Sequence, residues 1–391
     1  MKKIKLKRKL KNEDLFYNIL STVLRPFLRF RYDIETHNKD ILKNKEPYLI
    51  IGNHVMADDP VIVNFHSRKL IRYMAADTNY DTPWKRTIFS LGGAIPFSKG
   101  NSDFKAVKHL LRLVKNRKPV GLYPEGGRGW SGETEEIIFS TAKLIKILNN
   151  SVYRVMTKGG YMNKPRWADY YRKGKIHMHY DVLFHKEEVK KLTVEEIYEK
   201  IKKAIYHNEY SWQKENNYTY KGKNKAEHIE RLLYICTKCS TIDSLSSKGD
   251  EFKCTECGEK WKINDYGFIE GGFYDNTVEW NHWQKKQLYK KLKKSEITIN
   301  TKKIQFEKFE KNGKKLYNEE VLINLDDKNL KIKGREFNEK LDVKNIRAVS
   351  ITLLDIFEFY NKEEKYRIIF NPEVNPSIIY FLETLKYYSR S

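Results

Sequence analysis

The stretch YLIIGNHVMADD, residues 48–59, decides the fold of the first half of the chain and carries its chemistry. Residues 48–52 form a short apolar run with β-branched side chains, which predicts a buried strand. Asn53 and His54 follow at the carboxyl end of that strand, where open α/β sheets hold their sites. Asp59 then precedes a proline and a second apolar run, so we expect a helix to begin there.

Two interpretations of this stretch stand side by side. In the first, Asp59 is an ordinary helix N-cap with Pro60 at the first helical position, and His54 is a loop residue. In the second, His54 and Asp59 form a base and the carboxylate that orients it. A histidine and an aspartate at this spacing occur often by chance, so the stretch alone does not choose.

A second stretch bears on that choice. Residues 119–123 predict another short strand, and PEGGRG follows at 124–129. Glycines beside an arginine allow backbone amide hydrogens and a guanidinium to converge on an anionic oxygen cluster such as a phosphate. The alternative is a plain glycine turn.

Together the two stretches resemble the glycerolipid acyltransferase family, whose members carry N-H-x4-D and, later in the chain, P-E-G-x-R. Two further family blocks are visible, GAIPFSK at 93–99 and TAK at 141–143, and the resemblance covers residues 14 to about 205. Two positions depart from the family pattern: Lys99 stands where arginine is usual, and Gly127 stands where threonine is usual. Lysine keeps the charge but loses the bidentate fork, so the acceptor recognised can differ from the commonest one.

These residues can support direct acyl transfer from a thioester to a hydroxyl. His54 would take the proton of the attacking hydroxyl, and Asp59 would hold the imidazole in the productive tautomer. No serine or cysteine adjoins His54, which argues against a covalent acyl-enzyme. The expected substrates are acyl-CoA or acyl-ACP and a lysophospholipid or glycerol-phosphate acceptor, with no catalytic cofactor. The residues expected to bind substrate are Lys99, Glu125, Gly126, Gly127 and Arg128.

Between residues 46 and 207, short apolar runs alternate with helical patterns. This alternation predicts an α/β acyltransferase domain with a mixed sheet flanked by helices. Asn101 and Ser102 are expected to cap one of the helices. The expected strands are 48–52, 72–76, 94–97, 119–123, 152–156 and 176–184, and the expected helices are 60–70, 84–91, 102–116, 137–148 and 194–204.

The chain opens with a lysine-rich run at residues 2–11, followed by an apolar stripe at helical spacing from Phe16 to Leu28. A basic, amphipathic helix of this kind lies in the headgroup layer of anionic membranes, where each Lys or Arg near the surface adds roughly 1 kcal/mol. The alternative is a helix that simply covers the catalytic domain. Pro26 is expected to kink the helix in either case.

The net charge of +24, from 75 Lys and Arg against 51 Asp and Glu, favours anionic partners. An A+T-rich genome is a competing cause of so much lysine. No apolar run has the roughly 18 residues that span a bilayer, and no secretory signal pattern is visible. We therefore expect a cytoplasmic protein, peripheral on the inner face of the cell membrane, with an anionic membrane surface and a phosphorylated lipid acceptor as partners.

All four cysteines fall in two pairs, Cys236-x2-Cys239 and Cys254-x2-Cys257. This is the spacing of a zinc ribbon, in which four thiolates enclose a tetrahedral ion. Disulfides are the weaker alternative for an intracellular protein. Four thiolates make a closed site, so the expected zinc is structural. A nucleic-acid or protein-docking role for the ribbon is the competing interpretation of its purpose.

The remaining chain predicts a basic helix and then a mostly β domain closed by one helix, which Asn375 is expected to cap. Antiparallel strands followed by a C-terminal helix are similar to the pleckstrin-homology (PH) type of fold. The expected segments are a membrane-surface segment at 1–30, the acyltransferase domain at 31–207, a helical linker with the zinc ribbon at 208–277, the basic helix at 278–295 and the PH-like domain at 296–391.

Two other functions compete with acyl transfer. A zinc-ribbon nucleic-acid-binding protein would explain the charge, but it gives no role to the His54 and Glu125 stretches, so nucleic acid is an unlikely partner. Salt-dependent binding to DNA or RNA that survives His54→Ala would favour it. A catalytically inactive lipid-binding scaffold is the other alternative, and both motifs are too complete for it.

Overall fold

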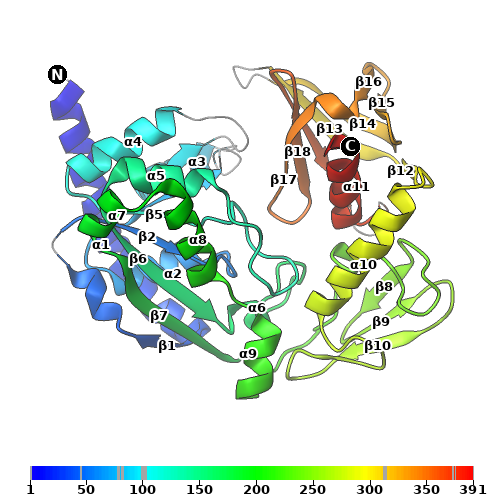
Figure 1. Cartoon of the computed structure of the whole chain (residues 1–391), viewed down its shortest axis with the longest axis horizontal. Coiled ribbons are helices and arrows are strands. Elements are labelled where there is room, and N and C mark those ends of the chain that lie inside the picture. The colour runs from blue at the N-terminus through cyan, green and yellow to red at the C-terminus, as the bar shows by residue number, and fades with distance from the viewer. Residues whose placement is uncertain are drawn as a thin grey trace. The chain divides into compact units, whose positions relative to one another are not determined.

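The computed structural model describes residues 2–44, 46–76, 80, 83–97, 104–310, 315–371, 374 and 376–390, with side chains from residue 9 onward. The chain forms two compact units, Met1–Arg166 with Arg172–Lys221, and Trp167–Tyr171 with Gly222–Ser391. Figure 1 labels most of their helices and strands. The residue boundaries of the five expected segments stay a prediction.

A seven-stranded sheet forms the centre of the N-terminal unit, in the order β1-β7-β6-β2-β5-β3-β4. β7 runs antiparallel to β6 and parallel to β1, while the other neighbours pair in parallel. The predicted α/β fold with a mixed sheet is confirmed. The strands are β1 (Asp33–His37), β2 (Tyr48–Gly52), β3 (Arg72–Ala76), β4 (Ile95–Phe97), β5 (Val120–Leu122), β6 (Ser151–Lys158) and β7 (Lys175–Phe184).

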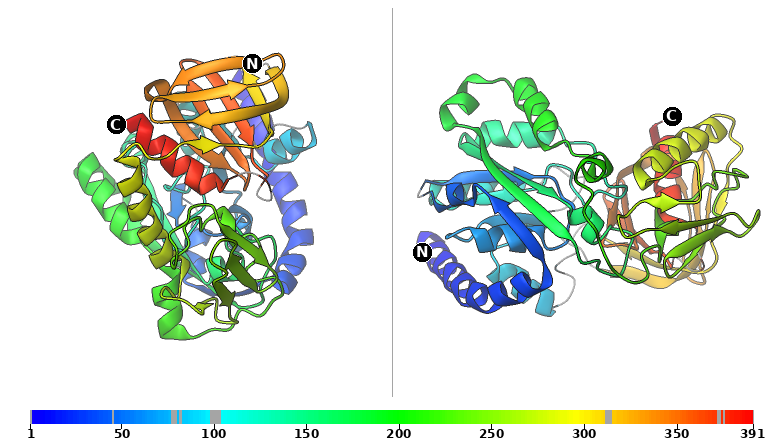
Figure 2. Two further views of the ribbon diagram at one scale, coloured as in Figure 1. Left: turned by 90° about the vertical axis from the view of Figure 1, so that its right-hand side faces the viewer. Right: turned by 90° about the horizontal axis from the view of Figure 1, so that it is seen from below.

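Helices cover both faces of this sheet, as the views in Figure 2 show. One apolar cluster joins the sheet to α4, α5 and α8, and a second lies on the other face beside α2. The helices are α2 (Asp59–His66), α3 (Pro83–Leu91), α4 (Phe104–Lys115), α5 (Ser140–Leu148), α6 (Gly160–Asn163), α7 (Lys186–Lys191), α8 (Val194–Ile205) and α9 (Glu209–Asn216), with a 3-10 helix η1 (Lys39–Lys43). The expected cap at Asn101 and Ser102 lies outside the described residues.

Helix α1 (Lys2–Arg31) runs through Pro26 and docks on the N-terminal unit by one face. The fully buried guanidinium of Arg72 donates from Nε to Glu13 Oε2 (2.8 Å) and from Nη2 to Asp14 Oδ1 (2.9 Å). Tyr17 donates its hydroxyl to the Asn64 carbonyl oxygen at 2.6 Å. The helix therefore covers the domain, as one of the two interpretations expected.

The opposite face of α1 is apolar and uncovered. Five large hydrophobic side chains on it are between 52% and 87% exposed, and they recur at intervals of three or four residues, which places them on one side of the helix. We call them the α1 stripe: Leu15, Ile19, Val23, Phe27 and Phe30.

The C-terminal unit begins with a small antiparallel sheet in the order β11-β10-β9-β8. Helix α10 packs on it, with Trp280 against Trp261 and Phe252 (ring centroids 5.1 and 5.8 Å). Its elements are η3 (Ile229–Arg231), β8 (Leu245–Lys248), β9 (Glu251–Cys254), β10 (Lys260–Ile263), β11 (Ile269–Glu270) and α10 (Thr277–Leu292).

An antiparallel sheet ordered β16-β15-β14-β13-β19-β18-β17, with β12 added beside β14, fills the rest of this unit. The predicted mostly β domain is confirmed, while its likeness to the PH type stays a prediction, and the Asn375 cap lies outside the described residues. The elements are β12 (Ile299–Asn300), β13 (Ile304–Phe309), β14 (Lys315–Leu325), β15 (Asn329–Lys333), β16 (Asn338–Asp342), η4 (Val343–Asn345), β17 (Ile346–Thr352), β18 (Ile356–Asn361), β19 (Glu364–Ile369) and α11 (Ile378–Arg390).

Candidate functional site

The site begins where the central strand β2 ends. The Asn53 side chain donates to the Thr157 carbonyl oxygen (2.8 Å) and accepts from the Thr157 amide (2.9 Å), so it extends the β2–β6 ladder by one residue. This double hydrogen bond fixes the backbone from which His54 projects. His54 Nδ1 lies 3.0 Å from Asp59 Oδ2, and the imidazole stacks on Tyr123 with ring centroids 4.2 Å apart.

The Asp59 carboxylate is held by the loop that carries His54. Its Oδ2 accepts the backbone amides of Val55 (3.0 Å) and Met56 (2.9 Å) as well as facing His54, and the side chain is only 1% exposed. The alternative in which Asp59 is the N-cap is wrong, because Asp58 occupies that position and α2 begins at Asp59. This buried carboxylate therefore stabilises the loop that carries His54.

Glu125 joins the second motif to the first. Its Oε1 accepts the backbone amide of His54 at 2.7 Å, and its Oε2 accepts the amide of Glu135 at 2.8 Å. The Gly129 amide donates back to the His54 carbonyl oxygen at 3.1 Å. These hydrogen bonds hold the backbone of His54 next to the loop that carries Glu125. Each carboxylate oxygen of Glu125 already accepts a hydrogen bond from a backbone amide. Its expected contact with substrate stays a prediction.

The glycine loop is turned sharply. Gly126 has φ of +69°, and a Cβ atom there would lie 2.6 Å from Ile138 Cδ1. The Gly126 amide donates to the Tyr123 carbonyl oxygen at 3.1 Å. That amide is occupied in the turn, so the expected phosphate donors on this loop reduce to the Gly127 amide and Arg128. Lys99, the other expected cation, lies outside the described residues.

A second arginine, which sequence reasoning missed, backs the loop. Arg166 is 6% exposed, its Nη1 donates to the Arg128 carbonyl oxygen at 2.6 Å, and its guanidinium lies 4.2 Å over the Trp130 ring. It belongs to no family block, and no local pattern distinguishes it from a surface arginine. Only the fold brings it to residue 128.

Burial and charge set the protonation of these groups. Burial lowers the pKa of His54 below its ordinary value, the Asp59 contact opposes this, and the positive charges of Arg128 and Arg166 add to the lowering. The lowered pKa favours the neutral imidazole at pH 7, and the carboxylate beside Nδ1 favours the tautomer in which Nδ1 carries the hydrogen and Nε2 is the acceptor. Burial also raises the pKa of Glu125 to about 8 and lowers that of Arg166 to about 9.

The four cysteines converge in the C-terminal unit. Cys236 Sγ lies 3.7 Å from Cys257 Sγ, Cys239 Sγ lies 3.7 Å from Cys254 Sγ, and all four thiols are free. Thiolates on a tetrahedral zinc with Zn–S bonds of about 2.3 Å stand roughly 3.8 Å apart, whereas disulfide sulfurs are about 2.05 Å apart. The donor set and its spacing fit a closed zinc site.

Both cysteine pairs use the same turn. In each, the residue four positions after the first cysteine has a positive φ, Ser240 at 59° and Gly258 at 73°. Each of these residues donates its amide to the carbonyl oxygen of that first cysteine, at 3.0 Å to Cys236 and 3.1 Å to Cys254. Two matching knuckles therefore present the thiols.

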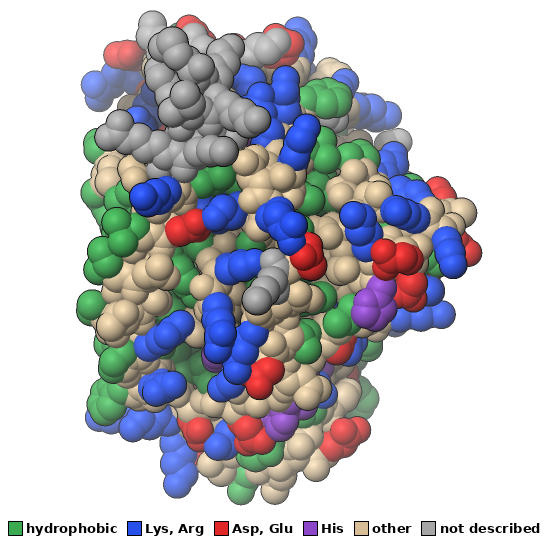
Figure 3. All heavy atoms as spheres, turned by 90° about the vertical axis from the view of Figure 1, so that its left-hand side faces the viewer, with side chains coloured by type: hydrophobic (Ala, Val, Ile, Leu, Met, Phe, Trp, Pro, Cys, Tyr) green, Lys and Arg blue, Asp and Glu red, His purple; other side chains and the backbone are tan. Residues whose placement is uncertain are grey.

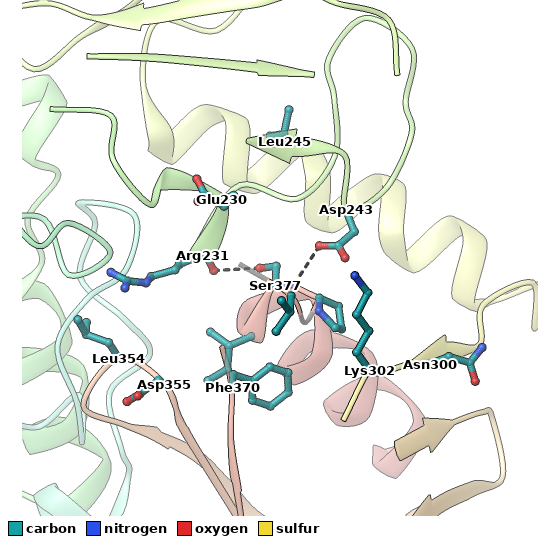
Figure 4. Close-up of a pocket in the computed structure, with 13 residues that line it drawn as sticks. Glu230, Arg231, Asp243, Leu245, Asn300, Lys302, Leu354, Asp355, Phe370 and Ser377 are labelled. Atoms are coloured by element: carbon teal, nitrogen blue, oxygen red, sulfur yellow. Dashed lines mark hydrogen bonds between the residues drawn. The ribbon is translucent and has the colours of Figure 1, made fainter. Parts of the chain in front are cut away.

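A cavity of about 380 Å³ lies within the C-terminal unit (Figure 4). Its lining includes the cations Arg231 and Lys302 and the acids Glu230, Asp243 and Asp355. Ser377 closes one side, with its amide on Asp243 Oδ1 and its hydroxyl on the Arg231 carbonyl oxygen, both at 2.9 Å. Among the described lining residues the three acids outnumber the two cations and there is no histidine, so the cavity offers no imidazole base for acyl transfer.

Comparison with known proteins agrees with the motif residues. Residues 33–155 match the family model described as Acyltransferase. The match covers under a third of the chain and includes His54, Asp59, Glu125 and Arg128. The N-terminal unit thus contains an acyltransferase-like domain.

Two further comparisons add little. Among solved structures, the 1-acyl-sn-glycerophosphate (LPA) acyltransferase PlsC from Thermotoga maritima aligns with 52% of this chain and 95% of its own, at 14% identity and a TM-score of 0.40. A likeness of that strength carries no argument about function. Curated protein sequences give no significant match.

Proposed function

We propose that this protein moves a fatty acyl group from a thioester, acyl-CoA or acyl-ACP, to a hydroxyl of a lysophospholipid or glycerol-phosphate acceptor. The observation that carries the proposal is the His54–Asp59 contact of 3.0 Å beside a glycine loop with two arginines. The His54 side chain is 19% exposed, so a hydroxyl can reach it from solvent.

In the proposed reaction, His54 Nε2 takes the acceptor's hydroxyl proton as the oxygen attacks the thioester carbonyl carbon. The tetrahedral oxyanion then collapses, the C–S bond breaks, and the imidazolium returns the proton to the departing thiolate. A positioned base contributes roughly 10²- to 10⁴-fold in rate. Asp59 holds the Nδ1 hydrogen and stabilises the imidazolium without taking its proton.

Arg128 is the proposed partner of the acceptor's phosphate, with the Gly127 amide beside it and Lys99 as a further cation. An arginine can grip a phosphate through two parallel hydrogen bonds, which would also set the direction of the hydroxyl. Arg166 has a positioning role, because its hydrogen bond to the Arg128 carbonyl oxygen and its contact with Trp130 hold the loop from behind.

The proposed location is an anionic membrane surface on the cytoplasmic side, reached through the α1 stripe. No helix in the described part of the chain is long and apolar enough to cross a membrane. Arg25 and Arg29 are exposed on the same helix, and Lys and Arg side chains are spread over the face of the molecule seen in Figure 3. An apolar stripe with flanking cations suits the headgroup layer.

In the C-terminal unit, the proposed occupant of the four thiolates is a structural zinc ion. The 3.7 Å spacings and the paired knuckles support it. A PH-like role for the β domain remains part of the proposal.

A product analysis tests the proposed reaction. Purified protein is given acyl-CoA or acyl-ACP with a panel of lysophospholipids and glycerol 3-phosphate, and products are identified by mass spectrometry. The expected result is an ester whose mass equals the acceptor plus the acyl group minus one hydrogen, with release of one thiol per ester. Thiol release that is independent of every acceptor, with free fatty acid as the product, would instead mark a thioesterase.

A further inference from the structure

Three histidines gather on the N-terminal unit, outside the acyltransferase motifs. His177 and His179 alternate along β7, and His37 ends the neighbouring edge strand β1. The parallel register pairs Glu35 with His177 and His37 with His179. Residues two apart on a strand, and residues paired across strands, share one face of a sheet. All four side chains therefore start from the same face.

The three imidazoles are in close contact. The His37 ring stacks on His179 with centroids 4.2 Å apart, and its centroid lies 5.9 Å from that of His177. One ring nitrogen from each histidine lies within 4.8 Å of the other two. Nitrogens bound to one zinc ion at about 2.0–2.1 Å stand roughly 3.3–3.4 Å apart in a tetrahedron. The three imidazoles therefore need to move only slightly to bind one ion together.

Plain ring stacking is the competing explanation, and it leaves one fact unexplained. His177 Nε2 is buried, and within the described part of the chain it has no hydrogen-bond partner. Buried polar atoms are normally paired, so an unpaired ring nitrogen inside this cluster calls for a ligand. Glu35 Oε1, 3.2 Å from His37 Nε2, adds a carboxylate to the same place.

The geometry points to a second metal site, in which His37, His177 and His179 bind a divalent transition-metal ion of the zinc class, with the Glu35 carboxylate available as a fourth ligand. Imidazole and carboxylate suit Zn²⁺, Co²⁺, Ni²⁺ and Cu²⁺, whereas the cysteine site offers only thiolates. The ion would tie the edge strand β1 to β7.

The surroundings fit this assignment. Trp212 and Tyr218 pack on the His177 ring, with centroids 5.7 and 5.3 Å away, so aromatic groups shield one side of the cluster. Lys158 is a nearby cation, because it pairs with His177 across β6 and β7. The Lys175 ammonium forms an ion pair with Asp33, with Nζ 3.0 Å from Oδ1. The Glu35 carboxylate offsets the positive charge of Lys158.

Zinc counting tests the proposal. Wild-type protein, His179→Gln, His177→Asn and the control His109→Gln, whose histidine lies on α4, are dialysed against Zn²⁺ and their bound zinc is measured by mass spectrometry. Wild type and the control should hold one zinc more per chain than either cluster variant. Affinity at the cluster should fall at least about 100-fold, because even outer-shell changes cost 10–100-fold. Equal zinc in all four proteins would overturn the proposal.

A second readout does not depend on the variants folding. Co²⁺ added to wild-type protein with its cysteine site filled should give visible bands without the intense thiolate-to-cobalt absorption, and Zn²⁺ should raise the melting temperature. No cobalt bands, or a rise in melting temperature with inorganic phosphate but not with Zn²⁺, would overturn the metal assignment. Neither readout uses acyl transfer, so failure here leaves the proposed function standing.

Discussion

The His54 site and the four-cysteine site are held in opposite ways. Around His54, the chain supplies every restraint: Asp59 accepts two backbone amides of the His54 loop, and Glu125 accepts one amide from that loop and one from its own. Around the cysteines, two local knuckles bring four thiols to spacings of 3.7 Å. Thiolates at so short a distance repel one another unless a cation lies between them.

The difference predicts that structure and chemistry can be separated. A change at the His54 site should remove turnover and leave the fold, because the other hydrogen bonds of the loops persist. A change at the cysteine site should remove structure and leave turnover, because none of its residues lies in the N-terminal unit. The predictions that follow test this contrast.

The largest expected effect is loss of the proposed structural zinc. Cys254→Ser replaces a thiolate by a poor zinc ligand, and structural zinc contributes roughly 10–16 kcal/mol of apparent binding free energy to small domains. The small sheet β8–β11 should lose its protection against hydrogen exchange, while acyl transfer to a soluble acceptor continues. Ser244→Ala, which removes only the hydroxyl 3.4 Å from Cys254 Sγ, is the control. A fully protected sheet in metal-free Cys254→Ser would contradict the contrast.

Asp59→Asn should be next in size. The variant keeps the shape of the side chain but no longer favours the Nδ1–H tautomer of His54, so kcat should fall by up to the roughly 10²- to 10⁴-fold that the base itself contributes. Asp58→Asn removes a charge at the adjacent residue, whose carboxylate accepts the Tyr32 hydroxyl at 2.6 Å, and should stay near wild type. Steady-state kinetics with thermal melting separates the two. Equal kcat values would remove Asp59 from the mechanism.

Glu125→Gln should have an intermediate effect. An amide nitrogen cannot accept a hydrogen bond, so either the His54 amide or the Glu135 amide loses its partner. A displacement of His54 by about 1 Å costs on the order of 10² in rate. Glu136→Gln, an exposed neighbour, serves as the control. An unchanged rate in Glu125→Gln would show that the two motifs need not be joined.

The same residue predicts a pH dependence of stability. Folding raises the pKa of Glu125 from its ordinary 4.5 to about 8, so the folded state holds a proton that the unfolded chain has released. Stability should therefore fall as pH rises from 4.5 toward 8, and this part of the fall should be absent in Glu125→Gln. Urea unfolding of both proteins between pH 5 and 9 measures it. Parallel pH profiles would contradict the assignment.

The smallest effect is expected at the α1 stripe. Ile19→Glu with Val23→Glu should lower binding to anionic vesicles by at least about tenfold, since burying either side chain is worth roughly 1.5–3 kcal/mol. Asn18→Glu with Thr22→Glu adds the same charge on exposed polar positions of the helix and is the matched control. Deleting residues 1–30 would be a poor test, because it removes Glu13 and Asp14 from the buried Arg72. Equal flotation of both double variants would place the anchor elsewhere.

The parts of the molecule that local sequence predicts are those where one segment makes its own contacts. β2 has the expected bounds because its residues form a continuous apolar run that is buried at every position. β3 also has the expected bounds, although it begins with Arg72 and is buried at only three of its five positions. The cysteine knuckles are equally local. The sequence does not predict β1, because DIETH is an edge strand with four polar residues and no apolar run.

The parts that sequence could not give depend on distant segments. Arg166 reaches the glycine loop only through the fold, and both hydrogen bonds of Glu125 go to backbone amides that no motif specifies. The three histidines had one visible signal, the alternation of His177 and His179 on an expected strand. The third histidine, His37, lies on β1, which the sequence does not predict.

The most direct test of the account is acyl transfer by His54→Ala, measured as ester product by mass spectrometry with acyl-CoA and the best acceptor of the panel. The control is His109→Ala, which removes an imidazole from α4. The account predicts a loss of about 10²- to 10⁴-fold in kcat for His54→Ala, with an unchanged melting temperature, and wild-type turnover for the control. Wild-type turnover in His54→Ala would contradict the central claim that this histidine is the base.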